Sequence, residues 1–157
     1  MSILIKNGMI IDGSGAPAYH GDLLIEGDNV AQIGTVNPQT QPEQIIDAAG
    51  LVVAPGFIDT HSHSDLNILL DPYVEPKVRQ GITTEILGQD GISMAPLPLE
   101  YVAPWRKNLA GLDGDSDQLD WGWKDTAGYF ELLEKSKVGP NVAYLVPHGN
   151  IRMAAMG

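Results

Sequence analysis

The sequence predicts an α/β protein, with a small all-β layer in residues 1–54 and the first units of a parallel β/α barrel in residues 55–157. Polar and apolar side chains alternate in the first part, which is typical of strands with one buried face. From Pro55 onward, apolar strands alternate with helical segments, which implies right-handed βαβ units and a parallel sheet. Polar residues follow the strands of this second part, where barrel proteins carry their functional groups.

The β layer is predicted from short alternating runs separated by turns. Residues 2–12 alternate around Gly8 and indicate two short antiparallel strands, followed by a turn at 13–15. Residues 22–34 predict a hairpin, and residues 43–56 carry a further strand or two. A sheet this short does not close a core alone, so we expect it to pack on the second part of the chain.

The second part is predicted as three strands with helical connections. A helix near Val74–Gln80 is expected to end at Gly81, because glycine readily adopts the left-handed conformation that terminates helices. After it come a strand at 82–88, a long connection rich in Pro, Gly and Asp at 91–124, a helix at 125–137 capped by Asp125 or Thr126, and a strand at 141–149.

Composition limits the classes of function. The chain has 157 residues, of which 43% are hydrophobic, and this is compatible with a packed core. The formal charge of −11 argues against nucleic acid or an anionic membrane as a partner. There is no cysteine, so disulfides, thiolate ligands and a cysteine nucleophile are excluded. We find neither a secretory signal nor a run near the ~18 apolar residues of a membrane span, and therefore expect a soluble cytoplasmic protein.

The most informative motif is PGFIDTHSH at residues 55–63. We interpret it as a buried apolar strand that ends in two histidines spaced i, i+2, so His61 and His63 are expected to point the same way. Two neutral imidazoles that converge at the carboxyl end of a strand can chelate a divalent metal. Asp59 shares their parity and is expected on the same side, as a carboxylate that orients the ligands. The alternative is a pair of solvated histidines in a strand-to-loop turn.

Four further polar residues are candidates for the same rim. Asp90 follows the second predicted strand and His148 ends the third. For His148, a structural hydrogen-bonded role is favoured over contact with substrate. Asp65 continues the parity of the two histidines and is expected either to orient a ligand or to cap the next turn. Glu85 lies within the second strand, and a paired structural role is favoured for it.

The long connection contains an acidic run, DGDSD at 113–117, that superficially suggests a calcium loop. Gln118 and Lys124 stand where such a loop needs glycine and glutamate, so we interpret the run as a solvated acidic loop. Three tryptophans of the same connection are expected to cover the barrel rim or an interface rather than to stack on a ligand: Trp105, Trp121 and Trp123.

Three segments together resemble the amidohydrolase superfamily and, within it, the N-acyl-D-amino-acid deacylases (D-aminoacylases). AAGLVVAPGFIDTHSHSD is similar to the superfamily's junction between a β-sandwich and the first barrel strand. GITTEILGQDGISMAPLP and NVAYLVPHGNIRMAAMG are similar to the deacylases' second and third strands with their following loops. The resemblance implies the N-terminal portion of a metal-dependent (β/α)8 (TIM) barrel hydrolase. Residues 1–54 would be part of a small β-sandwich, and residues 55–157 the first three units of a barrel that is incomplete in this chain.

The resemblance also implies an activity. The family hydrolyses the amide bond of N-acyl-D-amino acids with one or two divalent ions, usually Zn²⁺, and a metal-bound hydroxide attacks the carbonyl carbon. His61 and His63 would ligate one metal. Asp90 stands where the deacylases typically have a bridging cysteine, and we hypothesise that it bridges or binds the second metal position. The alternative for Asp90 is a turn aspartate that accepts bonds from local backbone amides.

The family's later groups have no counterpart in this chain: two histidines of the fifth and sixth strands and the general acid/base aspartate of the last strand. We therefore expect the isolated chain to be an inactive fragment, with a complementing C-terminal chain or a second copy as a candidate partner. Two alternatives stay open at this point. One is a cyclic-amide hydrolase such as a hydantoinase or dihydroorotase, and the other is a non-catalytic metal-binding module.

Overall fold

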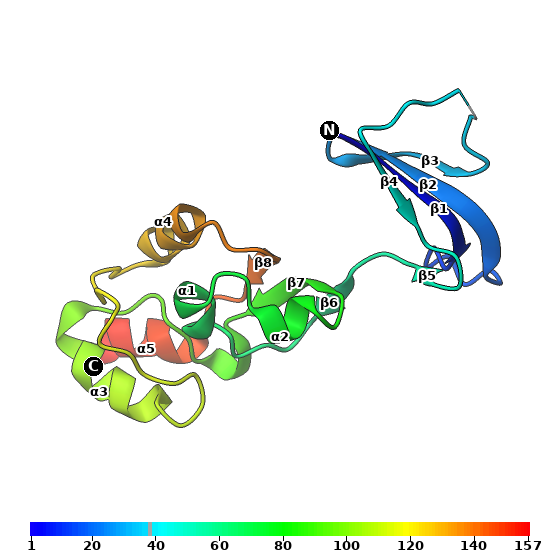
Figure 1. The fold of residues 1–157 in the computed structure, drawn as a ribbon. Coiled ribbons are helices and arrows are strands. Elements are labelled where there is room, and N and C mark those ends of the chain that lie inside the picture. The colour runs from blue at the N-terminus through cyan, green and yellow to red at the C-terminus, as the bar shows by residue number, and fades with distance from the viewer. Residues whose placement is uncertain (38) are drawn as a thin grey trace. The chain divides into compact units, whose positions relative to one another are not determined.

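The computed structural model describes residues 1–37 and 39–157, which divide into two compact units. The first unit is Met1–Pro55 and the second is Gly56–Gly157. Each unit contains its own β-sheet, and all the helices belong to the second unit (Figure 1).

The first unit is a five-stranded sheet in which β1 is central. Its strands are β1 (Ser2–Ile10), β2 (Tyr19–Glu26), β3 (Asn29–Gly34), β4 (Gln44–Asp47) and β5 (Val52–Val53). The order is β3-β2-β1-β4, and β5 also pairs with β1. β2 runs antiparallel to β1, whereas β4 and β5 run parallel to it. The predicted β2–β3 hairpin is confirmed.

The prediction of two strands in residues 2–12 is wrong, because β1 is one strand with an irregularity. Its register against β2 shifts between Ile5 and Gly8, and Asn7 adopts a positive φ of 62° there. A Cβ at Gly8 would lie 2.5 Å from Cγ2 of Val53, so the strand needs glycine where β5 approaches it. The alternation around Gly8 therefore marks a bulge and not a turn.

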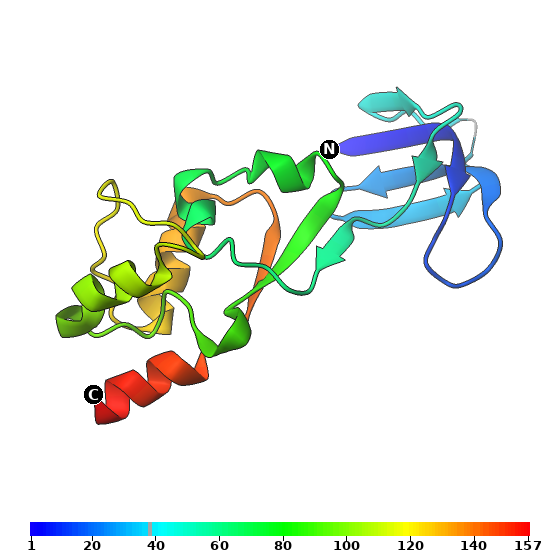
Figure 2. The same ribbon diagram turned by 90° about the horizontal axis from the view of Figure 1, so that it is seen from below.

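The second unit is built on a three-stranded parallel sheet in the order β6-β7-β8 (Figures 1 and 2). The strands are β6 (Phe57–Asp59), β7 (Ile82–Leu87) and β8 (Asn141–Tyr144). Asp59 pairs with Glu85, and Glu85 pairs with Val142, so the carboxyl ends of all three strands meet at one edge. Helices connect consecutive strands, and the α/β prediction is confirmed.

Five α-helices and two 3-10 turns accompany this sheet. They are α1 (Asn67–Leu70), α2 (Glu75–Val78), η1 (Gln89–Gly91), η2 (Leu99–Tyr101), α3 (Val102–Leu109), α4 (Thr126–Ser136) and α5 (His148–Met156). The predicted helix at 125–137 is confirmed as α4, and its N-cap is Asp125, whose carboxylate accepts a hydrogen bond from the Gly128 amide at 2.9 Å.

Two predicted elements differ from the structure. Residues 91–124 were expected to be a connection but contain α3, whose Pro104 lies in the first turn, where proline is tolerated. The strand predicted over 141–149 ends at Tyr144, and α5 begins at His148 directly after Pro147. β8 ends at its pair with Leu87, the last residue of β7, and Pro147 has no amide hydrogen with which to extend the ladder.

The core of the second unit lies between the sheet, α1, α4 and the long connection. Its fully buried members are Leu66, Ile68, Leu87, Met94, Ala95, Leu97 and Tyr129. Trp121 and Trp123 belong to this core, and Trp123 donates from Nε1 to the Met94 carbonyl at 2.9 Å. The expectation that they cover a rim or an interface is therefore wrong for these two tryptophans.

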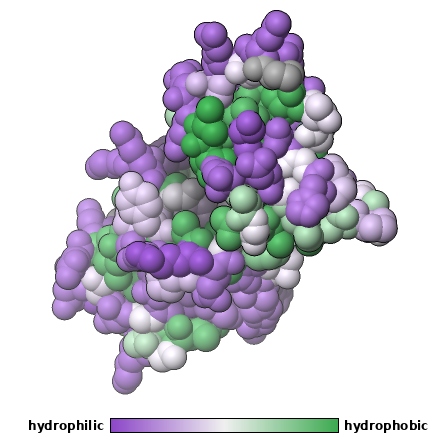
Figure 3. Space-filling model, turned by 45° about the vertical axis from the view of Figure 1, so that its right-hand side comes forward, coloured by the Kyte–Doolittle hydropathy of each residue, from purple (hydrophilic) through white to green (hydrophobic). Residues whose placement is uncertain are grey.

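β6 was expected to be buried, and in this chain it is not. The side chains of Phe57 and Ile58 are 61% and 60% exposed, because β6 pairs on one side only, with β7. Leu145 and Val146, which follow β8 on the opposite edge, are exposed as well. Apolar residues reach the surface as patches among hydrophilic ones (Figure 3). None of the helices in residues 1–37 and 39–157 combines the length and apolar character that a membrane crossing demands.

Candidate metal centre

The two histidines of the motif lie in the loop that follows β6. β6 ends at Asp59, two residues earlier than His61, and the loop stays close to β7 because the Ser62 amide donates to the Ile86 carbonyl at 3.3 Å. Asp59 accepts a hydrogen bond from the His61 amide at 3.2 Å, which turns the chain at the strand end. The histidine pair is thus carried by a loop held along the carboxyl end of the sheet.

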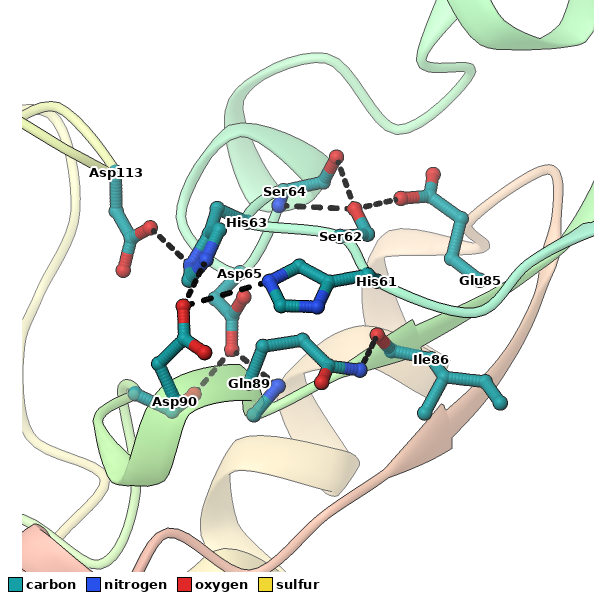
Figure 4. Close-up of polar contacts among 12 residues, drawn as sticks. His61, Ser62, His63, Ser64, Asp65, Glu85, Ile86, Gln89, Asp90 and Asp113 are labelled. Atoms are coloured by element: carbon teal, nitrogen blue, oxygen red, sulfur yellow. Dashed lines mark hydrogen bonds and ion pairs between the residues drawn. The ribbon is translucent and has the colours of Figure 1, made fainter.

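Both imidazoles converge on one carboxylate (Figure 4). His61 Nε2 lies 3.4 Å and His63 Nε2 lies 3.1 Å from the same Oδ2 atom of Asp90. The ring centroids are 5.4 Å apart with an interplanar angle of 63°, so the rings meet edge to face. His63 is largely covered, whereas His61 and Asp90 are more than half exposed. The three side chains form a cluster that is open to solvent on one side.

This cluster fits a divalent cation. One ligand atom from each of His61, His63 and Asp90 lies within 4.8 Å of the other two. Two imidazole nitrogens and one carboxylate oxygen are the donor types that Zn²⁺ takes, and three protein ligands leave a fourth position for water or substrate. A carboxylate in place of a thiolate also makes the site compatible with harder divalent ions.

Gly88 and Gln89 of the GQDG turn position Asp90 next to the two histidines. Gly88 has a φ of 77°, and a Cβ there would lie 2.0 Å from the Leu145 carbonyl oxygen, so only glycine fits. Gln89 donates from Nε2 to the carbonyls of Thr60, at 2.9 Å, and Ile86, at 2.8 Å. The glutamine therefore ties the turn to the histidine loop, and the Asp90 side chain points toward the imidazoles.

Asp65 lies beneath the histidine loop and joins it to the same turn. Its Oδ1 accepts hydrogen bonds from the Gly88 amide at 3.0 Å and from the Ser93 hydroxyl. Its Oδ2 is buried without a hydrogen-bond partner. Burial raises the pKa of the Asp65 carboxyl. The side chain lies in a second group of potential ligand atoms, with His63 and Asp113, and it does not cap α1.

Asp59 and Glu85 meet a lysine instead of the imidazole rings. Lys77 Nζ donates to Asp59 Oδ2 at 2.8 Å, to Glu85 Oε2 at 2.7 Å and to the Ser62 hydroxyl at 2.5 Å. The hydrogen bond from Lys77 lowers the pKa of Asp59. Glu85 is fully buried, and its ion pair with Lys77 is the structural role favoured for it from the sequence. Ser62, which separates the two histidines, is anchored by this group.

His148 is not brought into the cluster. It is exposed at the first position of α5, and it belongs to neither group of potential metal ligands. The structure places it beside Gly91, the last residue of the GQDG turn. Its position follows from the early end of β8, which removes it from the strand that was expected to carry it.

Asp113 is a residue that the sequence interpretation missed. It belongs to the acidic run after α3, yet its side chain is only 1% exposed, and its Oδ1 lies 3.5 Å from Nδ1 of His63. Burial and the nearby charge of Asp65 raise the pKa of Asp113 to about 6. The interpretation of 113–117 as a solvated loop is therefore wrong at Asp113, although it holds for the exposed Asp117. The composition of the run carries no signal that separates the buried acid from its solvated neighbours.

The chain belongs to the amidohydrolase family, whose model matches residues 44–157. An N-acyl-D-glutamate deacylase of Alcaligenes xylosoxydans xylosoxydans is 42% identical to it, over 99% of this chain and 30% of the relative. The crystal structure of the N-acyl-D-glutamate deacylase from Bordetella bronchiseptica, complexed with zinc and a phosphonate inhibitor, superimposes with a TM-score of 0.84 at 40% identity, covering 98% of this chain and 31% of that one.

A structure of D-aminoacylase, studied for its binuclear metal centre, superimposes with a TM-score of 0.82 at 34% identity and covers 98% of this chain and 31% of that one. The resemblance to the deacylases that the sequence indicated is therefore confirmed. The chain spans about 30% of the length of the curated relatives it matches.

Proposed function

We propose that this chain supplies the first metal-binding residues of an N-acyl-D-amino-acid deacylase, a hydrolase that cleaves a linear amide bond. The observation that carries the proposal is the convergence of His61, His63 and Asp90 at the carboxyl end of a parallel sheet. The similarity to deacylases over 98–99% of the chain supports this chemistry. The substrate class would be N-acyl-D-amino acids, as the names of these relatives indicate.

In this proposal His61, His63 and Asp90 would bind the cation, and the residues around them keep these three side chains in position. His61 and His63 would present Nε2, which faces Asp90 in both, and Asp90 would supply an oxygen to one or two ions. When bound, a divalent cation polarises an amide carbonyl and lowers the pKa of water. Gln89 keeps the Asp90 turn against the histidine loop, and the Lys77 group fixes Ser62 between the histidines. Because His61 and Asp90 are exposed, substrate reaches the site from their side.

We further propose that β6, β7 and β8 are the first three strands of a (β/α)8 barrel, and that residues 1–54 are part of a β-sandwich. Within the described residues, β6 and β8 each have one unpaired edge, with exposed apolar side chains at Phe57, Ile58, Leu145 and Val146. Such edges are normally paired or covered. The relatives are about three times longer, so further strands of a longer or complementing chain would cover them.

The remaining catalytic groups would also come from outside this chain. Among the described residues, both groups that could hold a metal contain His63, and neither includes a fourth protein ligand. Weak metal binding and no turnover are therefore expected of the 157-residue chain by itself.

Zinc titration of the chain against a chromophoric chelator tests the proposal. The parent chain should compete for zinc, and a variant with both His61→Ala and His63→Ala should lose that competition. His148→Ala, a histidine outside the cluster, is the matched control and should bind as the parent does. Equal zinc binding by the double variant and the parent would contradict the proposed site.

A second experiment tests the substrate class. Residues 1–157 replace the matching part of the Alcaligenes N-acyl-D-glutamate deacylase, and hydrolysis of N-acetyl-D-glutamate is compared with that of the L-enantiomer. Turnover restricted to the D-enantiomer and abolished by His63→Ala supports the proposal. A folded, zinc-loaded chimera that hydrolyses neither would contradict it.

A further inference from the structure

We infer that Asp113 is a positioning residue for the metal centre: its carboxylate accepts a hydrogen bond from Nδ1 of His63 and so directs Nε2 to the cation. The inference rests on the proposed function, because it concerns the same imidazole. The distance from Nδ1 to Asp113 Oδ1 is 3.5 Å, at the outer limit of a hydrogen bond. Hydrogen bonds of this kind are often long in empty sites and tighten on binding.

The polar atoms left unpaired around His63 support this pairing. His63 Nδ1 and both carboxylate oxygens of Asp113 are buried without a hydrogen-bond partner. Buried polar groups are costly unless they are paired, so atoms of opposite character that face each other across a short gap call for a functional reason. A hydrogen bond from Nδ1 of His63 to Asp113, whose atoms are 3.5 Å apart, resolves this. It satisfies Nδ1 and one oxygen of Asp113 together.

The ligand chemistry gives that reason. A neutral imidazole carries one proton, and a nitrogen that binds a metal must offer its lone pair, so metal binding at Nε2 requires the proton on Nδ1. A carboxylate at Nδ1 favours this tautomer, orients the ring and makes Nε2 more basic. Asp65, the other buried acid nearby, already uses its Oδ1 for the Gly88 amide and the Ser93 hydroxyl. Both oxygens of Asp113 are available for the ring.

The acidic run is built to hold Asp113 in place. The Asp113 amide donates to the Leu109 carbonyl at the end of α3, at 2.9 Å. Two residues further on, Asp115 accepts a hydrogen bond from Arg106 Nε at 2.6 Å, and Arg106 stacks 5.1 Å from the ring centroid of Trp121. The loop is therefore tied to α3 at Asp113 and again at Asp115, and Arg106 also contacts Trp121 of the core. The run that resembles a calcium loop instead delivers one buried carboxylate.

The nitrogen chemical shifts of His63 in the metal-free chain provide a test that needs no activity. Nδ1 and Nε2 are distinguished in a ¹⁵N-histidine-labelled chain at one fixed pH near 8, with His63→Gln used for assignment. In the parent, Nδ1 should show the shift of a protonated nitrogen. In Asp113→Ala it should show that of an unprotonated nitrogen, because the Asp90 carboxylate faces Nε2 at 3.1 Å and Asp65 already uses its Oδ1 for the Gly88 amide and the Ser93 hydroxyl.

Zinc affinity is the second measurement, by the same chelator competition. Asp113→Ala should weaken zinc binding by about 10-fold to 100-fold, the usual loss when a partner of a metal-bound histidine is removed. Asp113→Asn keeps the shape and one acceptor oxygen, so it should fall between Asp113→Ala and the parent, and it serves if Asp113→Ala does not fold. Asp117→Asn removes one charge from an exposed residue of the same run and should bind within about twofold of the parent.

Each result decides between distinct possibilities. An Nδ1 shift that is unchanged in Asp113→Ala, or an unchanged zinc affinity, would overturn the inference. If the Nδ1 shift changes between the parent and Asp113→Ala but the parent does not bind zinc, the proposed function would be overturned and the His63–Asp113 pair would stand. If the parent binds a second equivalent of zinc that Asp113→Ala loses, the inference would also be overturned, in favour of a cation between Asp65 and Asp113. Loss of both the Nδ1 proton and the affinity supports it.

Discussion

Replacement of Lys77 by methionine should destabilise the second unit and loosen the histidine loop together. Lys77 is the cation that faces Asp59 and the fully buried Glu85, and it also donates to Ser62. Removing one partner of a buried ion pair costs about 3–5 kcal/mol, because the other charge stays buried without compensation. Lys77 and Asp59 are about one quarter exposed, so solvent screens part of this loss and the low end, about 3 kcal/mol, applies.

Urea denaturation followed by tryptophan fluorescence measures this effect in the second unit alone. All three tryptophans lie between residues 105 and 123, within Gly56–Gly157. With a denaturant slope of about 2 kcal/mol/M, a loss of about 3 kcal/mol lowers the midpoint by roughly 1.5 M. Zinc affinity should fall in the same variant, because the Lys77 bond anchors Ser62 between the two metal-binding histidines.

Two further variants make the reasoning refutable. Lys77→Met leaves two carboxylates unpaired, the fully buried Glu85 and the partly exposed Asp59. Adding Glu85→Gln removes the buried charge and should restore stability to within about 1 kcal/mol of the parent. Arg79→Met breaks an exposed i,i+4 pair with Glu75 near the same helix and should cost less than about 0.5 kcal/mol. If Lys77→Met lowered stability no more than Arg79→Met, or if the double variant were less stable than Lys77→Met alone, the buried charge of Glu85 would not be what Lys77 compensates.

Three further changes have defined outcomes. Asp90→Ala should weaken zinc binding at least about 10-fold. Asp90→Cys should keep its zinc affinity and lose affinity for Mn²⁺, because a thiolate favours softer ions. Chelator competition with both metals measures these affinities, and unchanged zinc binding by Asp90→Ala would argue against a ligand role. Gly88→Ala should cost more than about 3 kcal/mol of stability or prevent folding, because its Cβ would lie 2.0 Å from a backbone oxygen at a φ of 77°. Gly114→Ala has a similar φ of 84° but no atom closer than 3.9 Å, and it should cost about 1 kcal/mol. Similar urea midpoints for the two variants would exclude steric contact as the cause. Asp125→Ala should cost about 1 kcal/mol through loss of the α4 cap, again by fluorescence, and no loss would show that the cap is dispensable.

Elements whose signals are local could be predicted from the sequence. α4 was predicted because an amphipathic run follows two candidate caps, Asp125 and Thr126, of which the structure uses Asp125. α3 was missed because Pro104 and the surrounding Pro, Gly and Asp residues have the composition of a loop, and only the position of the proline in the first turn reconciles them with a helix. Gly8 predicted a break between two strands where the structure has a register shift within β1, because glycine is typical of both.

The residues of the site also differ in whether a local sequence signal predicts them. His61 and His63 were predicted to end the first strand and Asp90 to follow the second, so the geometry of a parallel sheet was enough to expect them at one edge. The strand itself ends earlier than predicted, at Asp59, and the histidines lie in the loop after it. Lys77 was not singled out, because its partners depend on how α2 packs against β7. Asp113 lies 50 residues beyond His63 in the chain, and its burial depends on how α3 and the loop after it fold back onto the histidine loop. No local pattern contains that information.

The two nitrogens of His63 face carboxylates of opposite character, and this contrast assigns their roles. Asp90, at Nε2, is 58% exposed, so it exchanges freely among water, a cation and a substrate. Asp113, at Nδ1, is 1% exposed, so it faces His63 away from solvent. In the proposed centre, the exposed acid can enter the coordination sphere and the buried acid orients the imidazole. Exchanging the two environments, by exposing Asp113 or burying Asp90, would be expected to abolish the site even with every ligand still in the sequence.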